Sequence, residues 1–134
     1  MHRFSLDTRH PRQLIDITAR LQDWVTGTGI SDGMLLVFVP HTTAAVTINE
    51  NADPDVVFDL VNDLQRLVPD SAAFRHLEGN SAAHIQSSLI GASELLIVEQ
   101  GALVLGTWQS VYFCEFDGPR SRLFYAAITT GQGP

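Results

Sequence analysis

The sequence is poor in cysteine and in basic residues. Cys114 is the one cysteine among 134 residues, so an intrachain disulfide is excluded, and a lone thiol is typical of a reducing compartment. We therefore expect a cytoplasmic protein. Eight lysine and arginine residues stand against 15 acidic ones, which gives a net charge of -7. Nucleic acids and anionic membrane surfaces are bound mainly by clustered basic side chains, so this balance argues against both as partners.

Patterns that would indicate other protein classes are also missing. The chain has no apolar run long enough to span a bilayer, and residues 1–6 lack the basic and apolar stretches of a signal peptide. The glycines of Gly27-Thr28-Gly29 follow a predicted helix, whereas a phosphate-binding glycine loop opens one. No repeat or change in composition divides the chain, so we expect a single domain covering residues 1–134.

Hydrophobic periodicity predicts three helices and seven strands. The helices are expected at residues 11–25, 54–68 and 82–90. The strands are expected at residues 3–8, 34–39, 44–48, 94–98, 102–105, 108–116 and 122–129. Helices and strands are segregated along the chain and the second half is rich in strands, which predicts an α+β fold and not a doubly wound one.

Local signals place the helix ends. Pro11 and Pro54 suit the first position of a helix, and Asp53 and Ser81 suit the capping position before one. Glycines at positions 27, 29 and 91 and a proline at position 69 stop the predicted helices.

Three expectations concern the strands. Residues 34–39 are continuously apolar, which predicts a strand buried on both faces. Gly101 separates residues 94–98 from 102–105 and predicts a hairpin. The Asp117-Gly118-Pro119 turn predicts that residues 122–129 pair with residues 108–116.

Three of the five histidines are candidate ligands. His41 follows a predicted buried strand, a rigid position that faces a loop. His76 lies in a polar connecting segment, and His84 falls in the first turn of a predicted helix, where the helix dipole favours the neutral imidazole that a metal requires. Each also fits a plain structural role, and the spacing from His76 to His84 matches no standard zinc motif. His2 and His10 are interpreted as structural or exposed.

A second group of candidates follows the last long strand. Glu115 and Asp117 leave that strand on one face, as an exposed strand would also show. Arg120 suits bidentate capture of phosphate, or else pairs with Asp117 and stabilises the turn. Cys114 lies on the same side as Tyr112 and is interpreted as packed core.

Two more polar positions are candidates for ligand binding. Asn49 belongs to a polar segment that joins a strand to a helix start, where an anion or the waters of a cation can be held, although simple capping also explains the segment. Ser88 lies four residues after His84 and shares its helix face.

Three blocks of the sequence together resemble the YjbQ-like family, also called the secondary thiamine-phosphate synthase family. The first block is His41-Thr42-Thr43-Ala44 with residues 47–56, the second is Ala83-His84-Ile85 with residues 87–91, and the third is residues 105–109 with residues 112–120. The blocks occur in the family's order and cover nearly the whole chain.

The resemblance implies a sandwich-like, mixed and largely antiparallel sheet flanked by helices, assembled as a homotrimer with a pocket near the subunit boundary. It implies a divalent metal held by His41, His76 and His84. Imidazole ligands suit a zinc-like transition metal, whereas a pyrophosphate substrate would suit magnesium.

The implied reaction joins an aminopyrimidine methyl pyrophosphate to a thiazole phosphate and releases pyrophosphate. Such a reaction needs cations or donors where negative charge develops on the leaving group. We expect Arg120 to act there, and Thr42, Thr43, Asn49, Ser88 and Arg120 to contact the small phosphorylated substrate.

Two other functions fit the same residues. Three histidines with an open position suit a metal-dependent hydrolase of a phosphorylated or cyclic metabolite, with Glu115 as the general base. The histidines and a metal would equally suit a non-catalytic binding protein in which the metal stabilises the trimer.

Overall fold

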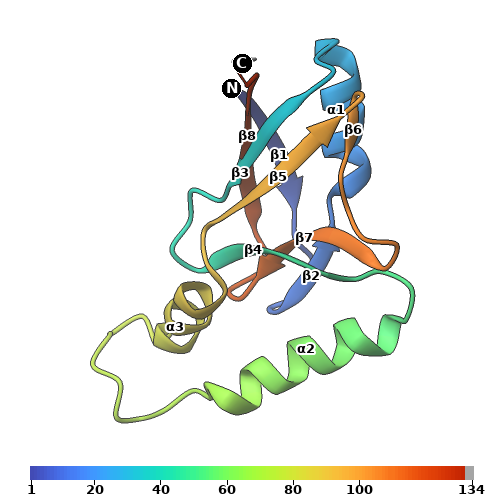
Figure 1. Cartoon of the computed structure of the whole chain (residues 1–134). Coiled ribbons are helices and arrows are strands. Elements are labelled where there is room, and N and C mark those ends of the chain that lie inside the picture. The colour runs from blue at the N-terminus through green and yellow to red at the C-terminus, as the bar shows by residue number, and fades with distance from the viewer. Residues whose placement is uncertain (132–134) are drawn as a thin grey trace.

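The structure is a computed structural model that describes residues 1–131 (Figure 1). Over this range the elements are β1 (His2–Asp7), β2 (Gln13–Asp16), α1 (Thr18–Thr28), β3 (Gly33–Phe38), β4 (Ala44–Glu50), α2 (Pro54–Leu67), α3 (Ser81–Ile90), β5 (Ser93–Glu99), β6 (Ala102–Leu103), β7 (Gln109–Glu115) and β8 (Ser121–Thr129). None of these helices is both long enough and apolar enough to cross a membrane.

The strands form two sheets. The larger has the order β1-β8-β3-β5-β6 and the smaller has the order β2-β7-β4. Within residues 1–131 every strand pairing is antiparallel. The expected largely antiparallel sandwich is confirmed, and no parallel pair occurs among these strands. The fold is α+β, as predicted.

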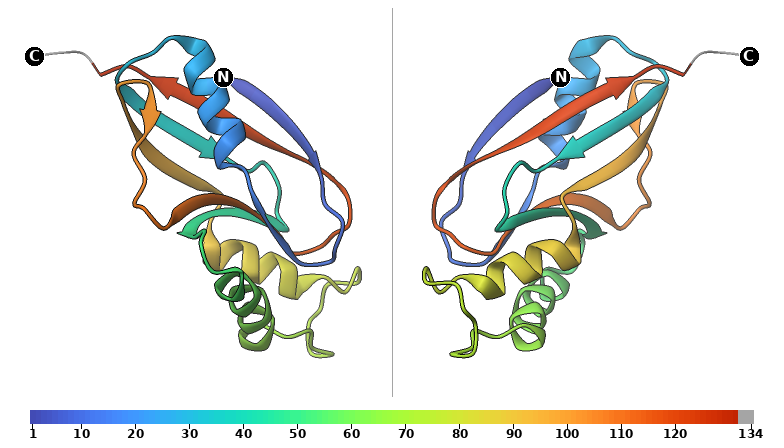
Figure 2. Two further views of the ribbon diagram at one scale, coloured as in Figure 1. Left: turned by 90° about the vertical axis from the view of Figure 1, so that its right-hand side faces the viewer. Right: turned by 90° about the vertical axis from the view of Figure 1, so that its left-hand side faces the viewer.

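The layers follow from which faces are apolar (Figure 2). The main core lies between the two sheets and α1, and it is built around Phe113 of β7 and Phe124 of β8 with Leu21 of α1. A smaller core joins the other face of the three-stranded sheet to α2 and α3 through Ala45, Cys114 and residues packed on them. The strand β7 is therefore covered on both faces, which fits its continuous burial from residue 110 to residue 115.

The predicted helix start at Pro11 is wrong. Residues 13–16 form the strand β2, in which Leu14 pairs with Cys114 and Ile15 with Phe113, and α1 begins only at Thr18. Leu14 and Ile15 fit a helix face and a short strand equally well in sequence, and the tertiary pairing with β7 decides between them. The expected end of the helix is correct, since Gly29 caps it in the left-handed conformation with φ 72.

The strand β3 is buried on one face only, which corrects the expected burial on both. Leu35 and Val37 point into the core, while alternate residues point away from it. Cross-strand pairing places Met34 beside Ile97 and Leu36 beside Leu95. The exposed apolar side chains of this surface, called the outer face below, are Met34, Leu36, Phe38, Leu95, Ile97 and Leu123.

The helix caps agree with the sequence in part. Asp53 accepts a hydrogen bond from the amide of Asp55 at 2.9 Å, so the predicted cap of α2 is confirmed. The capping position of α3 is taken by Asn80, while Ser81 is already helical. The side chain of Asn80 makes no capping hydrogen bond and turns elsewhere, to Asp117.

The predicted pairing of β7 with β8 is wrong, whereas the β5–β6 hairpin is confirmed. β7 lies in the small sheet and β8 in the large one, so residues 116–120 form a corner between sheets. Backbone bonds hold this corner, because the amide of Gly118 donates to Pro11 at 3.0 Å and the amide of Thr8 donates to Arg120 at 3.0 Å. A local turn signal reports a reversal of the chain and says nothing of which sheet the next strand joins.

Gly118 is needed at this corner because its neighbours leave no room for a side chain. A Cβ atom there would collide with the carbonyl oxygen of His10 and would lie 2.8 Å from both Glu115 Cγ and Thr8 Oγ1. We predict that Gly118→Ala lowers the free energy of unfolding by about 1–3 kcal/mol, as overpacking does. Gly27→Ala is the control, since a Cβ in that helical position meets nothing within 4 Å. It is expected to raise stability by roughly 0.5–1 kcal/mol. Urea unfolding of both variants checks this, and equal stability of the two proteins would contradict it.

Candidate functional site

One pocket gathers most of the predicted site residues. It has a volume of about 440 Å³ and is called the histidine pocket below. Its lining residues are Pro40, His41, Thr42, Thr43, His76, Glu78, Asn80, His84, Arg120 and Arg122. The structure thus brings together all three candidate histidines, both threonines and Arg120.

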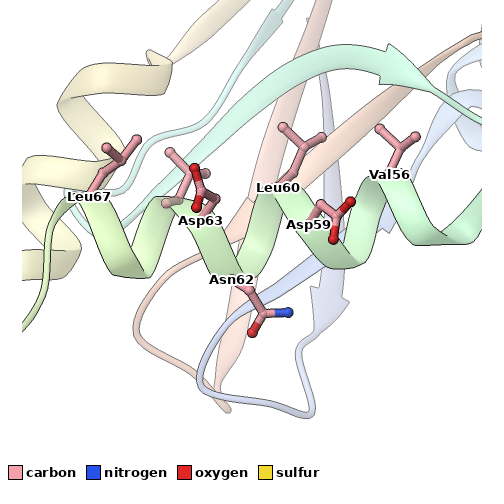
Figure 3. A pocket seen from close by; sticks show the side chains of 7 residues that line it. Val56, Asp59, Leu60, Asn62, Asp63 and Leu67 are labelled. Atoms are coloured by element: carbon pink, nitrogen blue, oxygen red, sulfur yellow. The ribbon is translucent and has the colours of Figure 1, made fainter.

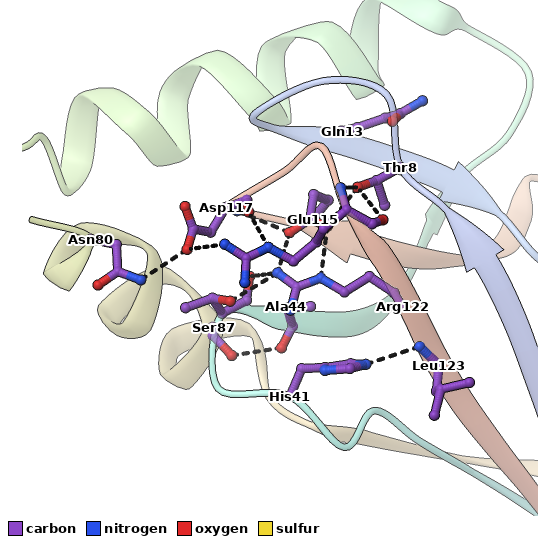
Figure 4. Close-up of polar contacts among 12 residues, drawn as sticks. Thr8, Gln13, His41, Ala44, Asn80, Ser87, Glu115, Asp117, Arg122 and Leu123 are labelled. Carbon is purple, nitrogen blue, oxygen red and sulfur yellow. Dashed lines mark hydrogen bonds and ion pairs between the residues drawn. The ribbon is translucent and has the colours of Figure 1, made fainter. Parts of the chain in front are cut away.

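Four separate segments build this pocket. The loop between β3 and β4 supplies His41 and the two threonines, and the long connection from α2 to α3 supplies His76, Glu78 and Asn80. The helix α3 adds His84, while the corner before β8 and the start of β8 add the two arginines. Figure 4 shows how these segments meet at the corner.

A buried ion pair joins Glu115 to Arg122, which is one of the residues that line the pocket. Arg122 has 4% of its surface exposed and Glu115 has 0%. The guanidinium of Arg122 makes a bidentate contact with the carboxylate of Glu115, in which Nε donates to Oε2 at 2.8 Å and Nη2 donates to Oε1 (Figure 4). Nη2 also donates to Thr43 Oγ1 at 2.8 Å. Such two-pronged contacts fix the orientation of both side chains.

The carboxylate of Glu115 is fully occupied by the protein. Besides the two bonds from Arg122, Oε2 accepts from Thr8 Oγ1 at 2.8 Å and Oε1 accepts from the amide of Asp117 at 2.9 Å. Burial raises the pKa of Glu115, but the hydrogen bonds from Arg122, Asp117 and Thr8 outweigh it and hold the pKa below its ordinary value. The expected role of general base does not fit this environment, because neither oxygen is free to take a proton from a ligand.

Arg120 and Asp117 form the pair that the sequence offered as the structural reading. Arg120 donates from Nη2 to Asp117 Oδ2 at 3.0 Å and from Nε to the carbonyl of Asp117 at 2.8 Å. The same Oδ2 atom accepts from Asn80 Nδ2 at 2.8 Å. Asp117 therefore ties the corner to the start of α3 while it orients Arg120. The pairing of Arg120 with Asp117 is confirmed, and phosphate capture by Arg120 stays a prediction.

The two arginines share one feature. In each of them Nε and Nη2 make the hydrogen bonds just described, and none of the hydrogen bonds within residues 1–131 uses Nη1 of either. Each guanidinium is thus held by a carboxylate on one side and keeps one donor group for a ligand. This arrangement suits an anion with several oxygen atoms.

His76 and His84 lie side by side in the pocket. Their ring centroids are 5.5 Å apart, with the ring planes at 89°. Glu78 Oε2 is 3.9 Å from His76 Nε2, so a carboxylate stands next to the imidazole. The side chain of His76 is 43% exposed, which leaves this ring accessible from solvent.

His41 is held by the backbone of β8. Its Nε2 accepts a hydrogen bond from the amide of Leu123 at 2.9 Å (Figure 4). Burial and the positive charge of Arg122 lower the pKa of His41 below its ordinary value, against the opposing effect of Glu115. The imidazole is therefore neutral near pH 7.

The three histidines do not fit a metal ion as they are arranged. Within residues 1–131 no group of three or more histidine, cysteine, aspartate or glutamate side chains is placed to hold one. Nε2 of His41 already accepts the Leu123 hydrogen bond, and a metal ligand needs a free lone pair. The metal stays a prediction from the resemblance, and no chemical step is derived through it.

Two expected substrate contacts lie outside the histidine pocket. Asn49 lines a separate hollow of about 200 Å³ with Trp108 and Gln109, and its side chain accepts a bond from the amide of Glu50. Ser88 is exposed on α3 and does not line the pocket, whereas the buried Ser87 donates to the carbonyl of Ala44 at 2.6 Å. Ser88 lies four residues after His84, but this spacing does not bring it into the pocket, because only the first turn of α3 lines the pocket.

Three pocket residues were missed by the sequence reasoning. These are Glu78, Asn80 and Arg122. Arg122 had a usable signal, because Phe124 and Ala126 at two-residue spacing are buried, which puts an arginine on the inner face of a strand. Glu78 and Asn80 lie in an irregular connection whose path no periodicity predicts.

Two other features are excluded as the site. Cys114 is buried in the small core, and burial raises its pKa to about 12, so its interpretation as packed core is confirmed. A larger hollow of about 570 Å³ runs along α2 and is lined only by residues of that helix (Figure 3). Its lining combines apolar side chains with Asp59, Asn62 and Asp63. All of these residues belong to α2, so no second segment adds polar groups to the lining.

The buried ion pair leads to a stability prediction. Arg122→Met leaves the Glu115 carboxylate buried without its partner, and we expect a loss of about 3–5 kcal/mol in the free energy of unfolding. Adding Glu115→Gln removes the unpaired charge, so the double variant is expected to recover part of that loss. Arg120→Gln is the control, because its half-exposed pair with Asp117 contributes about 1 kcal/mol or less.

Urea unfolding at pH 7 and at one fixed protein concentration measures these three variants and the single variant Glu115→Gln. A double variant that loses as much as the sum of its single changes would show that the two side chains act independently, contrary to this account.

Comparison with known proteins identifies the family to which the sequence is similar. Residues 2–131 match the family model described as UPF0047 protein YjbQ-like. The chain is 53% identical to the UPF0047 protein YugU of Bacillus subtilis over 84% of this chain and 86% of that protein. It is 47% identical to the UPF0047 protein MJ1081 of Methanocaldococcus jannaschii over 96% of this chain and 93% of that protein.

Solved structures show the same fold. An uncharacterized conserved protein of the YjbQ/UPF0047 family from Clostridium acetobutylicum superposes with a TM-score of 0.94 at 50% identity, covering 96% of this chain and 100% of that one. A conserved hypothetical protein from Thermus thermophilus superposes with a TM-score of 0.90 at 40% identity, covering 96% and 100% of the two chains. The sequence matches and the shared fold together show that the chain belongs to the YjbQ-like UPF0047 family.

Proposed function

We propose that the histidine pocket binds the phosphate or pyrophosphate group of a small metabolite, and that the chain is an enzyme acting at that group. The observation that supports this most is the pair of arginines, each oriented by a carboxylate and each with Nη1 left for a ligand. Thr42 and the three histidines add further polar groups around the same space.

The arginines stand out because the chain as a whole is acidic. With a net charge of -7, it does not attract anions through its overall field, so binding must come from local donors. Arg122 is nearly fully buried and is held in position by four hydrogen bonds from its side chain to Glu115 and Thr43. A donor fixed in this way loses little conformational freedom when it binds.

The reaction that the family resemblance favours is thiamine-phosphate synthesis. The bond between the aminopyrimidine methyl carbon and the pyrophosphate oxygen breaks, and a bond from that carbon to the thiazole nitrogen forms. Negative charge grows on the departing pyrophosphate, and Arg120 and Arg122 are the groups that would stabilise it. Binding both substrates in one pocket would supply the orientation that the joining step needs.

A metal-dependent or metal-free hydrolase is the second candidate, and the pair of His76 and Glu78 favours it. A carboxylate 3.9 Å from the imidazole would help that ring take a proton from a water molecule. This role moves the general base from Glu115 to His76. A hydrolase that acts on a phosphorylated metabolite would depend on the same arginines as the synthase.

The homotrimer also belongs to this proposal. The outer face exposes six large apolar side chains on one surface of the five-stranded sheet, and monomeric proteins rarely leave such a contiguous patch uncovered. We assign its cover to further copies of this chain. A cytoplasmic location remains part of the proposal, and the free Cys114 supports it.

The synthase is tested by supplying the full chain with both substrates and measuring thiamine phosphate and released pyrophosphate. We predict that Arg120→Gln lowers kcat/KM by about tenfold or more, because one donor to the leaving group is lost. Arg66→Gln is the matched control, since Arg66 also pairs with an aspartate three residues earlier but lies on α2 outside the pocket. It is expected to leave kcat/KM unchanged.

The outcomes separate the candidates. Product formation that falls only in the pocket variant supports the synthase. Hydrolysis of phosphoesters without synthesis, lost in His76→Gln, supports the hydrolase. If pyrophosphate binds with neither reaction, the chain is a binding protein, and if Arg120→Gln and Arg66→Gln behave alike, the pocket is not the site.

The assembly has its own test. We predict that Leu36→Glu dissociates the trimer, because a charge in the middle of the outer face is costly to bury between copies. Phe58→Glu is the control, since Phe58 is an exposed apolar residue on α2, beyond the other sheet. Light scattering after size exclusion measures the mass, which is three times 14.7 kDa for the wild type. A wild-type mass of one chain would refute the trimer.

A further inference from the structure

The hydrogen bond between Leu123 and His41 fixes which nitrogen of the imidazole carries a proton. A backbone amide can only donate, so Nε2 of His41, 2.9 Å from the Leu123 nitrogen, must be the unprotonated acceptor. A neutral imidazole carries one proton, which then sits on Nδ1.

The sheet explains why this bond forms. In the five-stranded sheet β8 pairs with β3 from residue 125 to residue 129, and the pairing stops at Phe38. Leu123 comes before that stretch, so its amide has no carbonyl of β3 to meet. His41, three residues past the end of β3, takes the place of that carbonyl. Nε2 is therefore part of the sheet's hydrogen bonding and is not a spare ligand atom.

Nδ1 is left for other contacts. No hydrogen bond within residues 1–131 uses it, and it is not among the buried side-chain atoms that lack a partner. His41 lines the histidine pocket together with Thr42, Thr43 and the two arginines. A donor at this position lies among the groups that the proposed function assigns to a phosphoryl ligand.

We infer that His41 acts as a neutral hydrogen-bond donor through Nδ1 to an oxygen of the phosphorylated ligand, and not as a metal ligand through Nε2. The donor role rests on the proposed function, whereas the tautomer rests on the Leu123 bond alone. A neutral donor beside two guanidinium groups recognises an oxygen atom without adding a third positive charge, so it favours phosphoryl groups over simple carboxylates through the number of donors and not through charge.

The tautomer can be read directly by NMR. Long-range proton–nitrogen correlation spectra of the full chain labelled with ¹⁵N-histidine distinguish the two neutral tautomers and the imidazolium, and the signals missing from His41→Asn assign His41. At pH 7.5 we expect the tautomer protonated on Nδ1. Adding zinc is expected to leave the Nε2 signal of His41 in place. A ring protonated on Nε2, or a zinc-dependent loss of that signal, overturns the inference.

The donor role is tested on the same sample with inorganic pyrophosphate. Pyrophosphate is expected to shift the Nδ1 signal of His41. If the tautomer is as expected but none of the pocket histidines, His41, His76 and His84, responds to pyrophosphate, the proposed function fails and the tautomer assignment stands. If other pocket residues respond and His41 does not, the donor role is overturned while phosphate binding stands.

Two substitutions separate a donor from a merely structural histidine. The amide nitrogen of asparagine occupies the place of Nδ1, and that of glutamine occupies the place of Nε2. Pyrophosphate affinity, measured by calorimetry, is expected to stay within roughly threefold in His41→Asn and to fall about tenfold or more in His41→Gln. Melting temperatures of both variants report on folding. Equal weakening in the two variants would overturn the role of Nδ1.

Discussion

The buried contact between Glu115 and Arg122 is the interaction on which the rest of the site depends. It joins the last residue of β7, in the small sheet, to the second residue of β8, in the large one. Thr8 and Thr43 bond to the same pair, so the ends of four segments meet at two side chains. Removing two charges from water is costly, and good geometry with every lone pair satisfied is what makes such a pair tolerable. The contact therefore contributes less net stability than its Coulomb energy suggests, and its main effect is to specify one arrangement of the corner.

That arrangement determines what the pocket can do. A long arginine is normally mobile, and ordering it on a ligand costs conformational entropy. Here Glu115 orders Arg122 during folding, and Asp117 does the same for the more exposed Arg120. Both guanidinium groups then offer their remaining nitrogen without further adjustment, which is the property that favours binding of charge developing in a transition state. The carboxylates act by positioning the arginines, and this explains why Glu115 is placed so close to the candidate pocket and is still unsuited to proton transfer.

The sequence predicted the positions of the helices and strands better than it predicted which strands pair and which faces are covered. Period-two and helical patterns located every element except β2 and the boundary of α1, because Leu14 and Ile15 satisfy both periods and only pairing with β7 chooses one. The continuous apolar run of β3 indicated burial on two faces, but the chain covers only one of them, since an apolar run does not tell an exposed apolar face from a buried one. In the site, one pocket is lined by His41, His76, His84 and Arg120, which the family resemblance had grouped, while their roles stay predictions. The resemblance did not reveal Arg122, whose role depends on the corner between sheets, nor the hydrogen bond that commits Nε2 of His41.

Leu123 contacts both the histidine pocket and the exposed apolar outer face. Its amide holds His41 in the pocket, while its side chain lies on the apolar outer face. Strand geometry fixes the amide and the side chain relative to each other, so whatever covers the outer face also constrains the position of the donor to His41. A bare outer face would leave β8 freer at this point, and a backbone shift of a few tenths of an ångström suffices to weaken a hydrogen bond of 2.9 Å. Assembly and ligand recognition would then be linked through one residue. In that case the affinity of the pocket for phosphoryl groups would rise with protein concentration, as it does wherever a binding-competent state forms only on association.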